Sequence, residues 1–531
     1  MAKVYNTPGV YIEENSAFPN SVVPVNTAVP AFIGYTEKAI QDKKSIKNIP
    51  TRISSYGEYL MYFGEGPKIT YEIKPNEDKN KVYDLAPLKE TRYFMFNCLK
   101  MFFANGGSDC YIVSIGDYKT PVAKSDFDGE ITDDLGEKRL VGISALKKYA
   151  EPTILVIPDA VLLAQDDCYA LQRQMLIHCG QDMQNRIAIL DVFNGFQTKK
   201  TGVPIDDSIT RFREGIGSQF LDFGAAYYPW LYTSITTTAS IDFTNIAPTS
   251  EAAFIHLLSE DVDRNVADGL LNAEKAVKIK EKFNEMPNTR ALLAKKEALL
   301  STTPEEKLNE KTEVENLHQT LLAISPLYKS IINDLRDHLN LLPPSAAIAG
   351  IYCMVDNSIG VFQSPANVSV GAVIKPAVDL TNEEQENLNL PLDGKAVNAI
   401  RTFPGKGVLV WGARTMDGNS QDWRYISVRR TVIFIEQSIK NAAEAYVFEP
   451  NTAPTWTNLK TLVMNFLANV WQQGALAGAT AADAFSVDIG LGVTMTPIDI
   501  LDGYMRMTVK IAVTRPAEFI VITFQQQMQK T

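Results

Sequence analysis

Two aspartates lie at the ends of predicted strands, where α/β enzymes often have catalytic acids. Asp159 follows the apolar run Ile154–Ile157, and Asp191 follows the run Ile187–Leu190. If both runs are neighbouring parallel strands, their carboxyl ends meet at one edge of the sheet, where such folds bind ligands. A metal-assisted hydrolase would use carboxylates there, but no phosphate-binding glycine loop or further ligand accompanies them. Because strand-end aspartates also cap helices and turns, a catalytic pair and a capping role both stay open.

Other patterns that carry chemistry are incomplete. Ser144-Ala145-Leu146-Lys147 and Lys200-Thr201-Gly202 match two of three serine β-lactamase motifs, but the middle motif is missing and the two matches lie too close together. Gly405-Lys406-Gly407 lacks the rest of a phosphate loop, and turn geometry explains its glycines. The histidines do not pair at metal-ligand spacing and are expected at the surface or in interfaces: His178, His256, His318 and His338. These incomplete motifs predict no catalytic residue, and the sequence predicts no cofactor and no metal.

Composition excludes several classes of protein. A net charge of -11 on 531 residues argues against a general nucleic-acid binder, which needs a basic surface. The five cysteines are an odd number without a Cys-x-x-Cys pair, which predicts buried reduced thiols. No signal peptide and no apolar run of about 20 residues is visible. We therefore expect assembly in the cytoplasm without membrane insertion.

The centre of the chain alternates between strands and helices. Apolar runs at 110–113, 154–157, 187–190 and 224–228 predict strands, and two segments between them predict helices, at 167–180 and 207–222. Continuous apolar strands separated by helices are typical of a parallel sheet that is covered on both faces. The fold class is expected to be α/β, or mixed α+β, with several domains.

Six segments are expected along a chain that is too long for one core. They are an extended N-terminal arm with the first strand (1–35), a linker or N-terminal part of the body (36–89), an outer α/β domain (90–250), a helical insertion of two or three long helices (251–344), a C-terminal domain (345–514) and a C-terminal arm (515–531). Pro343-Pro344 is expected to mark the boundary before the C-terminal domain.

Both ends of the chain have features of inter-subunit arms. Prolines exclude a helix from the first 30 residues, and an arm of ~20 residues reaches ~65 Å when extended. Met505–Val513 alternate with a period of two, as in a half-buried strand. Phe519–Phe524 lack this alternation, so a strand there needs cover on both faces. Addition to a neighbouring chain's sheet and pairing within the same subunit both stay open.

The C-terminal domain is expected to contain two helices joined by a turn. The first covers about 428–443, and the turn contains Glu449-Pro450-Asn451. Pro454 begins the second helix, at about 456–473, which has an apolar stripe. The stripe consists of Trp456, Leu459, Val463, Phe466, Leu467 and Val470.

These segments resemble contractile tail sheath proteins. The motifs occur in the family's order in the first 35 and the last 185 residues, while 90–340 resembles the variable outward domain of such sheaths. The motifs that carry the resemblance are Thr7–Glu14, Ala31–Gly34, Ala349–Tyr352, Gly407–Thr415, Trp423–Ile426, Val428–Arg430, Phe448–Asn451 and Arg515–Phe519. The resemblance implies a C-terminal sheath domain joined by the N-terminal arm, with an inserted outer α/β domain that carries a helical hairpin.

The resemblance also implies a structural function. Six copies would form a ring, and rings would stack helically around an inner tube. The sheath would contract from a metastable extended state and drive the tube through a target envelope. The partners would be other copies of the chain, the inner tube protein, and baseplate and terminal cap proteins, with no nucleic acid. The particle would be a phage tail or an extracellular contractile injection system, released from the cell or membrane-anchored.

Three sets of residues follow from the resemblance. The N-terminal arm would contact a neighbour through Val4, Tyr5, Pro8, Gly9, Val10, Tyr11 and Ile12. The C-terminal strand would do so through Pro516, Ala517, Glu518, Phe519, Ile520, Val521, Ile522 and Phe524. Core or interface positions typical of the family are Trp411, Arg414, Arg429, Arg430, Glu449 and Trp456. The alternative is an enzyme, hydrolase-like, on the central α/β domain with Asp159 and Asp191 as its carboxylates, which would form small closed oligomers instead of polymers.

Overall fold

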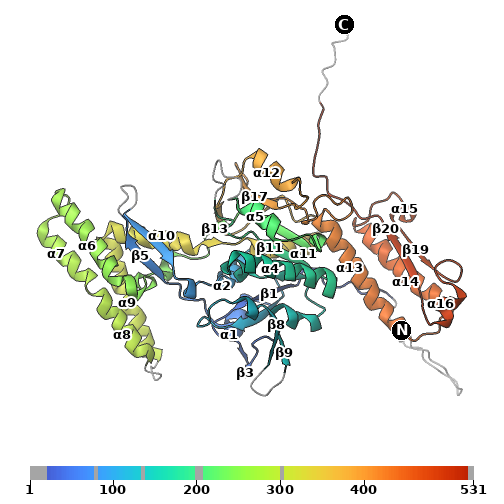
Figure 1. Cartoon of the computed structure of the whole chain (residues 1–531), viewed down its shortest axis with the longest axis horizontal. Helices are drawn as coiled ribbons and strands as arrows, with labels where there is room; N and C mark the ends of the chain where they lie inside the picture. Colours follow the sequence, from blue (N-terminus) through green and yellow to red (C-terminus); the bar gives the residue numbers. More distant parts are fainter. Residues whose placement is uncertain (1–20, 77–81, 133–137, 198–206, 299–303, 524–531) are drawn as a thin grey trace, which may run out of the picture. The chain divides into compact units, whose positions relative to one another are not determined.

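The computed structural model describes residues 21–76, 82–132, 138–197, 207–298 and 304–523, and side chains at 293–311 are not described. The chain forms two compact units (Figure 1). Among the described residues, the sheet unit consists of those within 27–360 and 364–429, and the C-terminal unit consists of 21–26, 361–363 and 430–523. No helix among the described residues combines the length and the apolarity needed to cross a bilayer.

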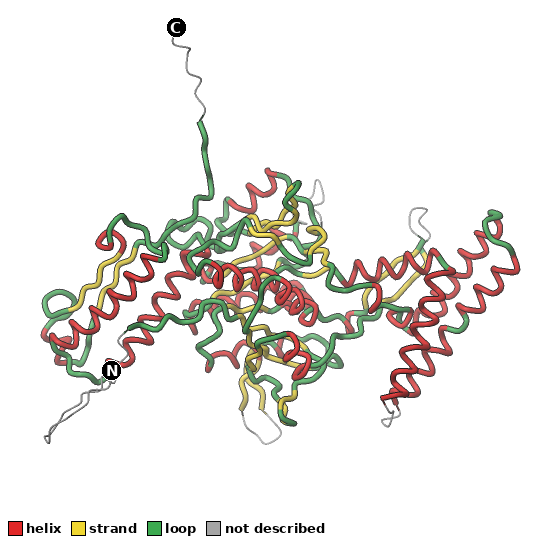
Figure 2. Tube along the Cα trace, turned by 180° about the vertical axis from the view of Figure 1, so that it is seen from behind, coloured by secondary structure: helices red, strands yellow, loops and turns green. Residues whose placement is uncertain are grey.

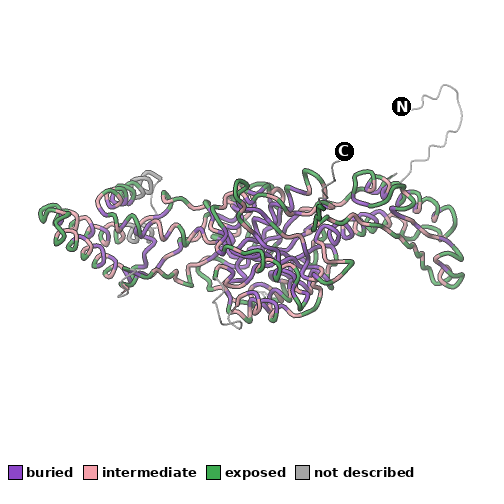
Figure 3. The backbone as a smooth tube through the Cα atoms, turned by 90° about the horizontal axis from the view of Figure 1, so that it is seen from above, coloured by how far each residue is buried: buried purple, intermediate pink, exposed green. Residues whose placement is uncertain are grey.

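A nine-stranded sheet is the core of the sheet unit. Its order is β15-β18-β17-β12-β11-β10-β1-β7-β4, and the strands from β7 through β1, β10, β11 and β12 to β17 run parallel. The interior of the sheet unit is buried (Figure 3). Every residue is buried in the expected first strand and in the four strands predicted from apolar runs: β1 (Pro30–Tyr35), β7 (Cys110–Gly116), β10 (Ile154–Val156), β11 (Ile187–Asp191) and β12 (Gly224–Tyr228). The predicted parallel sheet is confirmed, because strands buried on both faces need no polar alternation.

The sheet also contains segments from outside the expected α/β domain. β17 (Asn398–Phe403) pairs in parallel with β12, and β18 (Gly407–Trp411) returns antiparallel to β17. β15 (Val368–Ser369) and β4 (Thr51–Ile53) form the two edges. The expected domain boundary at residue 345 therefore lies inside one unit. The strands after residue 345 pair with strands before it in the same sheet.

Helices cover this sheet. The main ones are α2 (Met95–Ala104), α4 (Gln165–Ile177) and α11 (Ser345–Ser358). The predicted helix at 207–222 is shorter, since α5 is Ser208–Gly215. α2 and α11 pack closely, and a Cβ on Gly350 of α11 would lie 2.5 Å from the carbonyl oxygen of Phe102. Pro343-Pro344 thus leads directly into a helix of the same unit and does not separate two domains.

The helical insertion contains more helices than predicted. Its five described helices are α6 (Glu251–Ala267), α7 (Ala273–Phe283), α8 (Met286–Ala298), α9 (Pro304–Ile324) and α10 (Pro326–Leu339). The breaks come from local caps: the side chain of Asn272 accepts from the amides of Glu274 and Lys275, and that of Ser325 accepts from Tyr328. The prediction of two or three long helices was wrong because these caps divide one apolar pattern into shorter pieces.

The insertion has a hydrophobic core of its own. The hairpin of β5 (Tyr71–Pro75) and β6 (Tyr83–Pro87) packs with the helices (Figure 2). Buried members of this core include Ile69, Tyr71, Ile73, Phe243, Phe254, Leu258, Phe283, Leu321, Tyr328 and Leu335. The segment 36–89 is therefore no linker, because it gives β4 to the large sheet and β5 and β6 to the insertion core.

The C-terminal unit packs helices on a two-stranded sheet. Its elements are α14 (Ala453–Gln472), α16 (Pro497–Leu501), β19 (Phe485–Ile489) and β20 (Met507–Ile511), together with α13 (Ile426–Ala443) from residue 430 onward. β19 and β20 are antiparallel, which confirms the strand predicted from alternation. The predicted stripe of α14 forms the core through Leu459, Val463, Phe466, Leu467 and Val470. Val22 also lies in this core, and the amide of Val25 donates to Ser438 Oγ at 3.2 Å.

Candidate assembly interface

Asp159 lies at the end of β10, as predicted, but it caps a helix. Its carboxylate accepts hydrogen bonds from the backbone amides of Tyr35 (3.3 Å), Phe94 (2.6 Å) and Met95 (3.3 Å). The last two amides belong to the N-cap residue and the first residue of α2, where the helix offers no backbone partner. Burial raises the pKa of Asp159 to about 6, while these three hydrogen bonds act in the opposite direction.

Asp191 has the same role at the neighbouring strand. Its two carboxylate oxygens accept from Ser345, one from the amide at 2.8 Å and one from the hydroxyl at 2.5 Å. Ser345 is the first residue of α11. Burial raises the pKa of Asp191 to about 7. Both aspartates are enclosed, at 0% and 3% exposure, so the alternative enzyme has no accessible carboxylate at these positions.

The remaining motifs are explained by local packing. Ser144 Oγ donates to Asp128 at 2.6 Å, and Lys147 pairs with Asp182 at 3.0 Å. Lys200-Thr201-Gly202 lies outside the described residues. Gly405 and Gly407 have φ of +76° and +80° in the β17–β18 turn, so their prediction as turn glycines is confirmed. No cluster of metal-ligating side chains occurs in the described part of the chain.

The cysteines and histidines test two predictions about burial. All five cysteines are buried and free, as predicted. The prediction of surface histidines was wrong for His178 and His318, which are 0% and 5% exposed. His178 Nε2 lies 3.3 Å from the buried Arg186 guanidinium, and burial lowers the pKa of His178 to about 3. His318 Nδ1 lies 2.8 Å from the hydroxyl of Tyr328.

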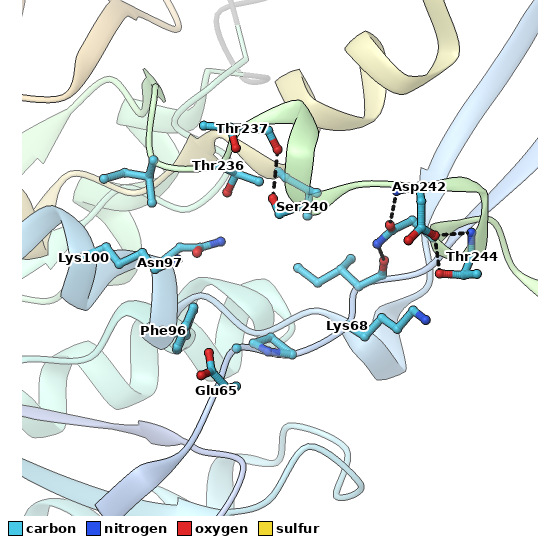
Figure 4. Close-up of a pocket in the computed structure, with 16 residues that line it drawn as sticks. Glu65, Lys68, Phe96, Asn97, Lys100, Thr236, Thr237, Ser240, Asp242 and Thr244 are labelled. Carbon is cyan, nitrogen blue, oxygen red and sulfur yellow. Dashed lines mark hydrogen bonds between the residues drawn. The ribbon is translucent and has the colours of Figure 1, made fainter. Parts of the chain in front are cut away.

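The sheet unit has a pocket of about 460 Å³ between α2 and the start of the insertion (Figure 4). Lys68 and Lys100 contribute its cations, and the Lys100 ammonium lies 4.5 Å from the centre of the Phe96 ring. The polar groups of the wall bond to one another, since Asp242 accepts from the Thr244 amide at 2.7 Å and Asn245 donates to the Ile69 carbonyl at 2.9 Å. The wall therefore stabilises the base of the insertion.

Family-type arginines lie inside the sheet unit. Arg414 is 1% exposed and donates to the Gly418 carbonyl at 3.1 Å. The Arg429 guanidinium lies 3.8 Å from the Phe223 ring centre and 4.5 Å from the Trp423 ring centre, with Asp222 at 3.6 Å. The two rings attract the cation, and loss of Asp222 would leave a buried charge unpaired. Arg414 and Arg429 thus have structural roles within this subunit.

The other family-type residues differ in exposure. Arg430, in the C-terminal unit, is buried at 4% exposure. Trp411 is 36% exposed, with its ring centre 4.5 Å from that of Phe403. Glu449 is exposed. These positions alone do not identify an interface.

The motif Phe448-Glu449-Pro450-Asn451 forms a fixed loop between α13 and α14. Trp456 Nε1 donates to Asn451 Oδ1 at 2.7 Å, and Asn451 Nδ2 donates to the Tyr504 carbonyl at 3.0 Å. The same loop leaves the Phe448 side chain 102% exposed, at a φ of 70°. Sequence reasoning predicted the turn but missed this exposed ring, whose only sequence signal is an aromatic residue beside a turn.

The C-terminal segment is uncovered in the single chain. Residues 516–523 form no helix and no strand, and this includes Pro516, Ala517 and Glu518. Phe519, Ile520, Val521 and Ile522 are 67%, 79%, 88% and 69% exposed. Four consecutive exposed apolar side chains are unusual for a soluble monomer. Phe524 and all the predicted arm residues from Val4 to Ile12 lie outside the described residues.

Comparison with known proteins identifies the relatives of this chain. Residues 419–527 match the family model of the phage tail sheath C-terminal domain. The tail sheath protein of Vibrio phage KVP40 is 26% identical over 164 residues, which is 30% of this chain and 24% of that protein. The tail sheath protein of Enterobacteria phage T4 is 26% identical over 155 residues, 29% of this chain and 23% of that protein. These matches thus span about a quarter of the length of the curated relatives.

Solved structures match over almost the whole chain. The contracted sheath complex of PVC, an extracellular contractile injection system, is 25% identical with a TM-score of 0.56, and the match covers 99% of each chain. The contracted helical sheath of the anti-feeding prophage is 26% identical with a TM-score of 0.55, covering 99% of this chain and 100% of that one. The resemblance to contractile tail sheath proteins and the mixed α/β class are thereby confirmed.

Proposed function

We propose that this chain is the structural sheath subunit of a contractile injection apparatus. The observation that carries the proposal is the full-length match to two contracted sheaths at 25–26% identity, with 99% of the chain covered. The uncovered apolar segment at 519–522 supports it, because a subunit that polymerises has surface reserved for its neighbours. The chain acts as a mechanical element and has no catalytic function.

An extracellular contractile injection system is the machine that the comparisons favour. The contracted sheath complex of PVC, which is an extracellular contractile injection system, matches this chain at 25% identity over 99% of its own length. The subunits assemble in the cytoplasm around an inner tube, with baseplate and terminal cap proteins at the ends.

Six subunits form each ring, and the rings stack helically. Such contacts are heterologous, because they close within a ring and propagate along the axis. The arms at both ends add strands to sheets of neighbouring subunits. Burying an apolar side chain contributes about 1.5–3 kcal/mol. Burial of residues 519–522 against a neighbour therefore contributes several kcal/mol, which offsets the conformational entropy lost when the segment becomes ordered. The resulting mesh keeps subunits linked while they slide.

Contraction releases free energy that is stored during assembly. The extended sheath is metastable, and a kinetic barrier separates it from the contracted packing. Contacts that exist only in the contracted state supply the driving force, so the sheath needs no nucleotide. The inner tube is then driven through the target envelope.

Electron microscopy of the purified full-length chain tests the proposal. We expect hollow tubes with six-fold end views, whereas an enzyme would run as a small closed oligomer on size exclusion. Deletion of residues 1–14 is expected to give a folded, soluble chain that forms no tubes. Tubes of normal length from this deletion would contradict the arm contact.

The C-terminal contact has its own matched test. The variant Phe519→Ser with Val521→Ser places two hydroxyls in the uncovered segment and should abolish tubes without changing the unfolding of the monomer. The control is Leu392→Ser, since Leu392 is 106% exposed on the sheet unit. Normal tubes from the double variant would show that the C-terminal segment is not an inter-subunit contact.

A further inference from the structure

A second exposed apolar surface lies in the C-terminal unit, away from the chain end in sequence. We name it the Phe448 patch, and its members are Val447 (60% exposed), Phe448 (102%), Leu491 (50%), Val493 (68%), Ile498 (67%), Leu501 (85%) and Tyr504 (55%). It combines the loop after α13 with α16 and the connection between β19 and β20. The function proposed above does not account for this surface.

Hydrogen bonds join the segments that carry the patch. Asn451 Nδ2 donates to the Tyr504 carbonyl at 3.0 Å, and the Tyr504 amide donates to the Asp499 carbonyl at 2.7 Å. Thr494 Oγ1 donates to the Arg506 carbonyl at 2.6 Å. The loops therefore hold their apolar side chains in place before any partner arrives, which lowers the entropy lost on binding.

Phe448 is the protruding member of the patch. A bulky non-glycine residue at a φ of 70° is a backbone outlier, and its ring is fully solvated. Both features are unfavourable in an isolated subunit, so their coincidence at one residue indicates a function. Aromatic anchors that fill a partner's pocket are typical binding hot spots.

The rim of the patch is acidic. Arg506 is paired with Asp499 at 3.0 Å, and the exposed Lys440 lies one helical turn before Glu444. The segments that carry the apolar members contain three exposed carboxylates. These are Glu444, Glu449 and Asp502. Two such patches repel each other, so the patch does not fit a symmetric contact with itself. It fits an apolar surface with a basic rim.

The same chain carries a surface of that kind on the sheet unit. We name it the basic hairpin, residues 38–49, in which β2 (Ile40–Gln41) pairs with β3 (Lys44–Ser45) (Figure 1). Ile40 and Ile49 are 49% and 43% exposed. Four exposed lysines and one aspartate accompany them: Lys38, Lys43, Lys44, Lys47 and Asp42.

The tip of the hairpin has unusual backbone geometry. Asp42 and Lys43 have φ of 50° and 64°, the pattern of a type I′ turn, which normally places glycine second. The Ile46 amide donates to the Ala39 carbonyl at 3.0 Å and fixes the base of the hairpin. Lysine in place of glycine puts an exposed cation in the turn.

We propose that the Phe448 patch of one subunit docks on the basic hairpin of a second copy in the assembled sheath. The contact joins unlike surfaces, and it is therefore the heterologous kind that propagates along a helical stack. Phe448 inserts between Ile40 and Ile49, and Glu449 and Asp502 face Lys43 and Lys44. This inference rests on the proposed sheath function and names one contact within it.

Charge exchange in the full-length chain tests the contact. The hairpin variant combines Lys43→Glu with Lys44→Glu, and the patch variant combines Glu449→Lys with Asp502→Lys. Each is expected to raise the critical concentration for tube formation at least tenfold, because like charges then face each other. The chain that carries all four substitutions should recover tubes. The control is Lys275→Glu with Lys278→Glu on exposed positions of α7, which changes the net charge by the same amount as the hairpin variant and should leave assembly unchanged.

Phe448→Gly separates docking from folding. Glycine adopts a positive φ without strain, so the monomer should unfold at the same or a higher temperature. Loss of a hot-spot ring should raise the critical concentration about 30-fold. Leu270→Gly, at a 76% exposed site in the insertion, is the matched control for assembly and should leave the critical concentration unchanged.

The outcomes distinguish this contact from the function on which it rests. A wild-type chain that forms no tubes at any concentration overturns the sheath function and this contact with it. Wild-type tubes together with normal assembly of Phe448→Gly overturn the contact alone and leave the patch to a different partner, such as the inner tube. Failure of the fourfold variant to assemble, while the control assembles, overturns the pairing of these two surfaces.

Discussion

Replacing Asp191 by asparagine should change how the stability of the sheet unit depends on pH. The carboxyl has a pKa of about 7 in the folded chain against an ordinary value of 3.8, because it is buried at the start of α11. A folded-state pKa above the unfolded-state value means that the folded chain binds the proton more tightly. The stabilisation is complete below about pH 4 and is lost as pH rises through 7.

The magnitude follows from these two pKa values. Ionising this carboxyl in the folded chain costs about 4 kcal/mol, of which about 3 kcal/mol falls between pH 5 and pH 9. Asparagine keeps an acceptor for the Ser345 amide but does not ionise. Asp191→Asn should therefore be less stable than wild type at pH 5, and the difference should shrink or reverse by pH 9.

Urea unfolding of the dilute, unassembled chain at pH 5, 7 and 9 measures this effect. Hydrogen exchange of residues 345–358 gives a local readout at α11. All other titrating groups are common to both proteins and cancel in the difference. If the stability difference is constant across this range, or if asparagine becomes more harmful at high pH, the carboxylate is charged and stabilising in the folded chain and the reasoning is wrong.

Three further predictions concern the packing of both units. Leu467→Ala, at a fully buried position of α14, should lower the unfolding free energy by about 2–5 kcal/mol. Met464→Ala, at a position of 41% exposure, should lower it by under about 1 kcal/mol. Equal losses for the two variants in urea unfolding would contradict the assigned core. Asn451→Ala removes the hydrogen bonds to Trp456 and Tyr504 and should lower the unfolding free energy by about 1–3 kcal/mol. An unchanged melting temperature in thermal unfolding would refute this prediction. Burial raises the pKa of the Cys98 thiol well above its ordinary value, so no cysteine should react with Ellman's reagent at pH 8 until denaturant is added; rapid reaction of the native chain would disprove burial.

Local sequence patterns were sufficient for the elements that are buried on both faces. β10 and β11 were predicted because runs such as Ile154–Ile157 contain no polar residue. The stripe of α14 was predicted for a similar reason, since one helix face supplies the core. The pairing of β12 with β17 was missed, because no local pattern identifies a strand partner about 170 residues away.

The aspartates show the same limit at the level of single side chains. Their strand-end positions were predicted correctly, but their roles depend on tertiary neighbours. Only the fold places the amides of Phe94 and Met95 against Asp159, and Ser345 against Asp191. Phe448 is the opposite case: an aromatic residue is expected to be buried, and only the loop geometry shows that it is exposed.

The self-contained core of the helical insertion has a consequence for engineering. The core contains residues from two stretches of the chain, 69–83 and 241–335. More than one connection of the chain therefore joins the insertion to the rest of the sheet unit. Foreign sequence spliced into the α6–α7 connection would extend a surface loop without opening that core, since Leu270 there is 76% exposed. Every subunit of the polymer would carry the addition, so a single genetic fusion would display a peptide at regular intervals along the particle.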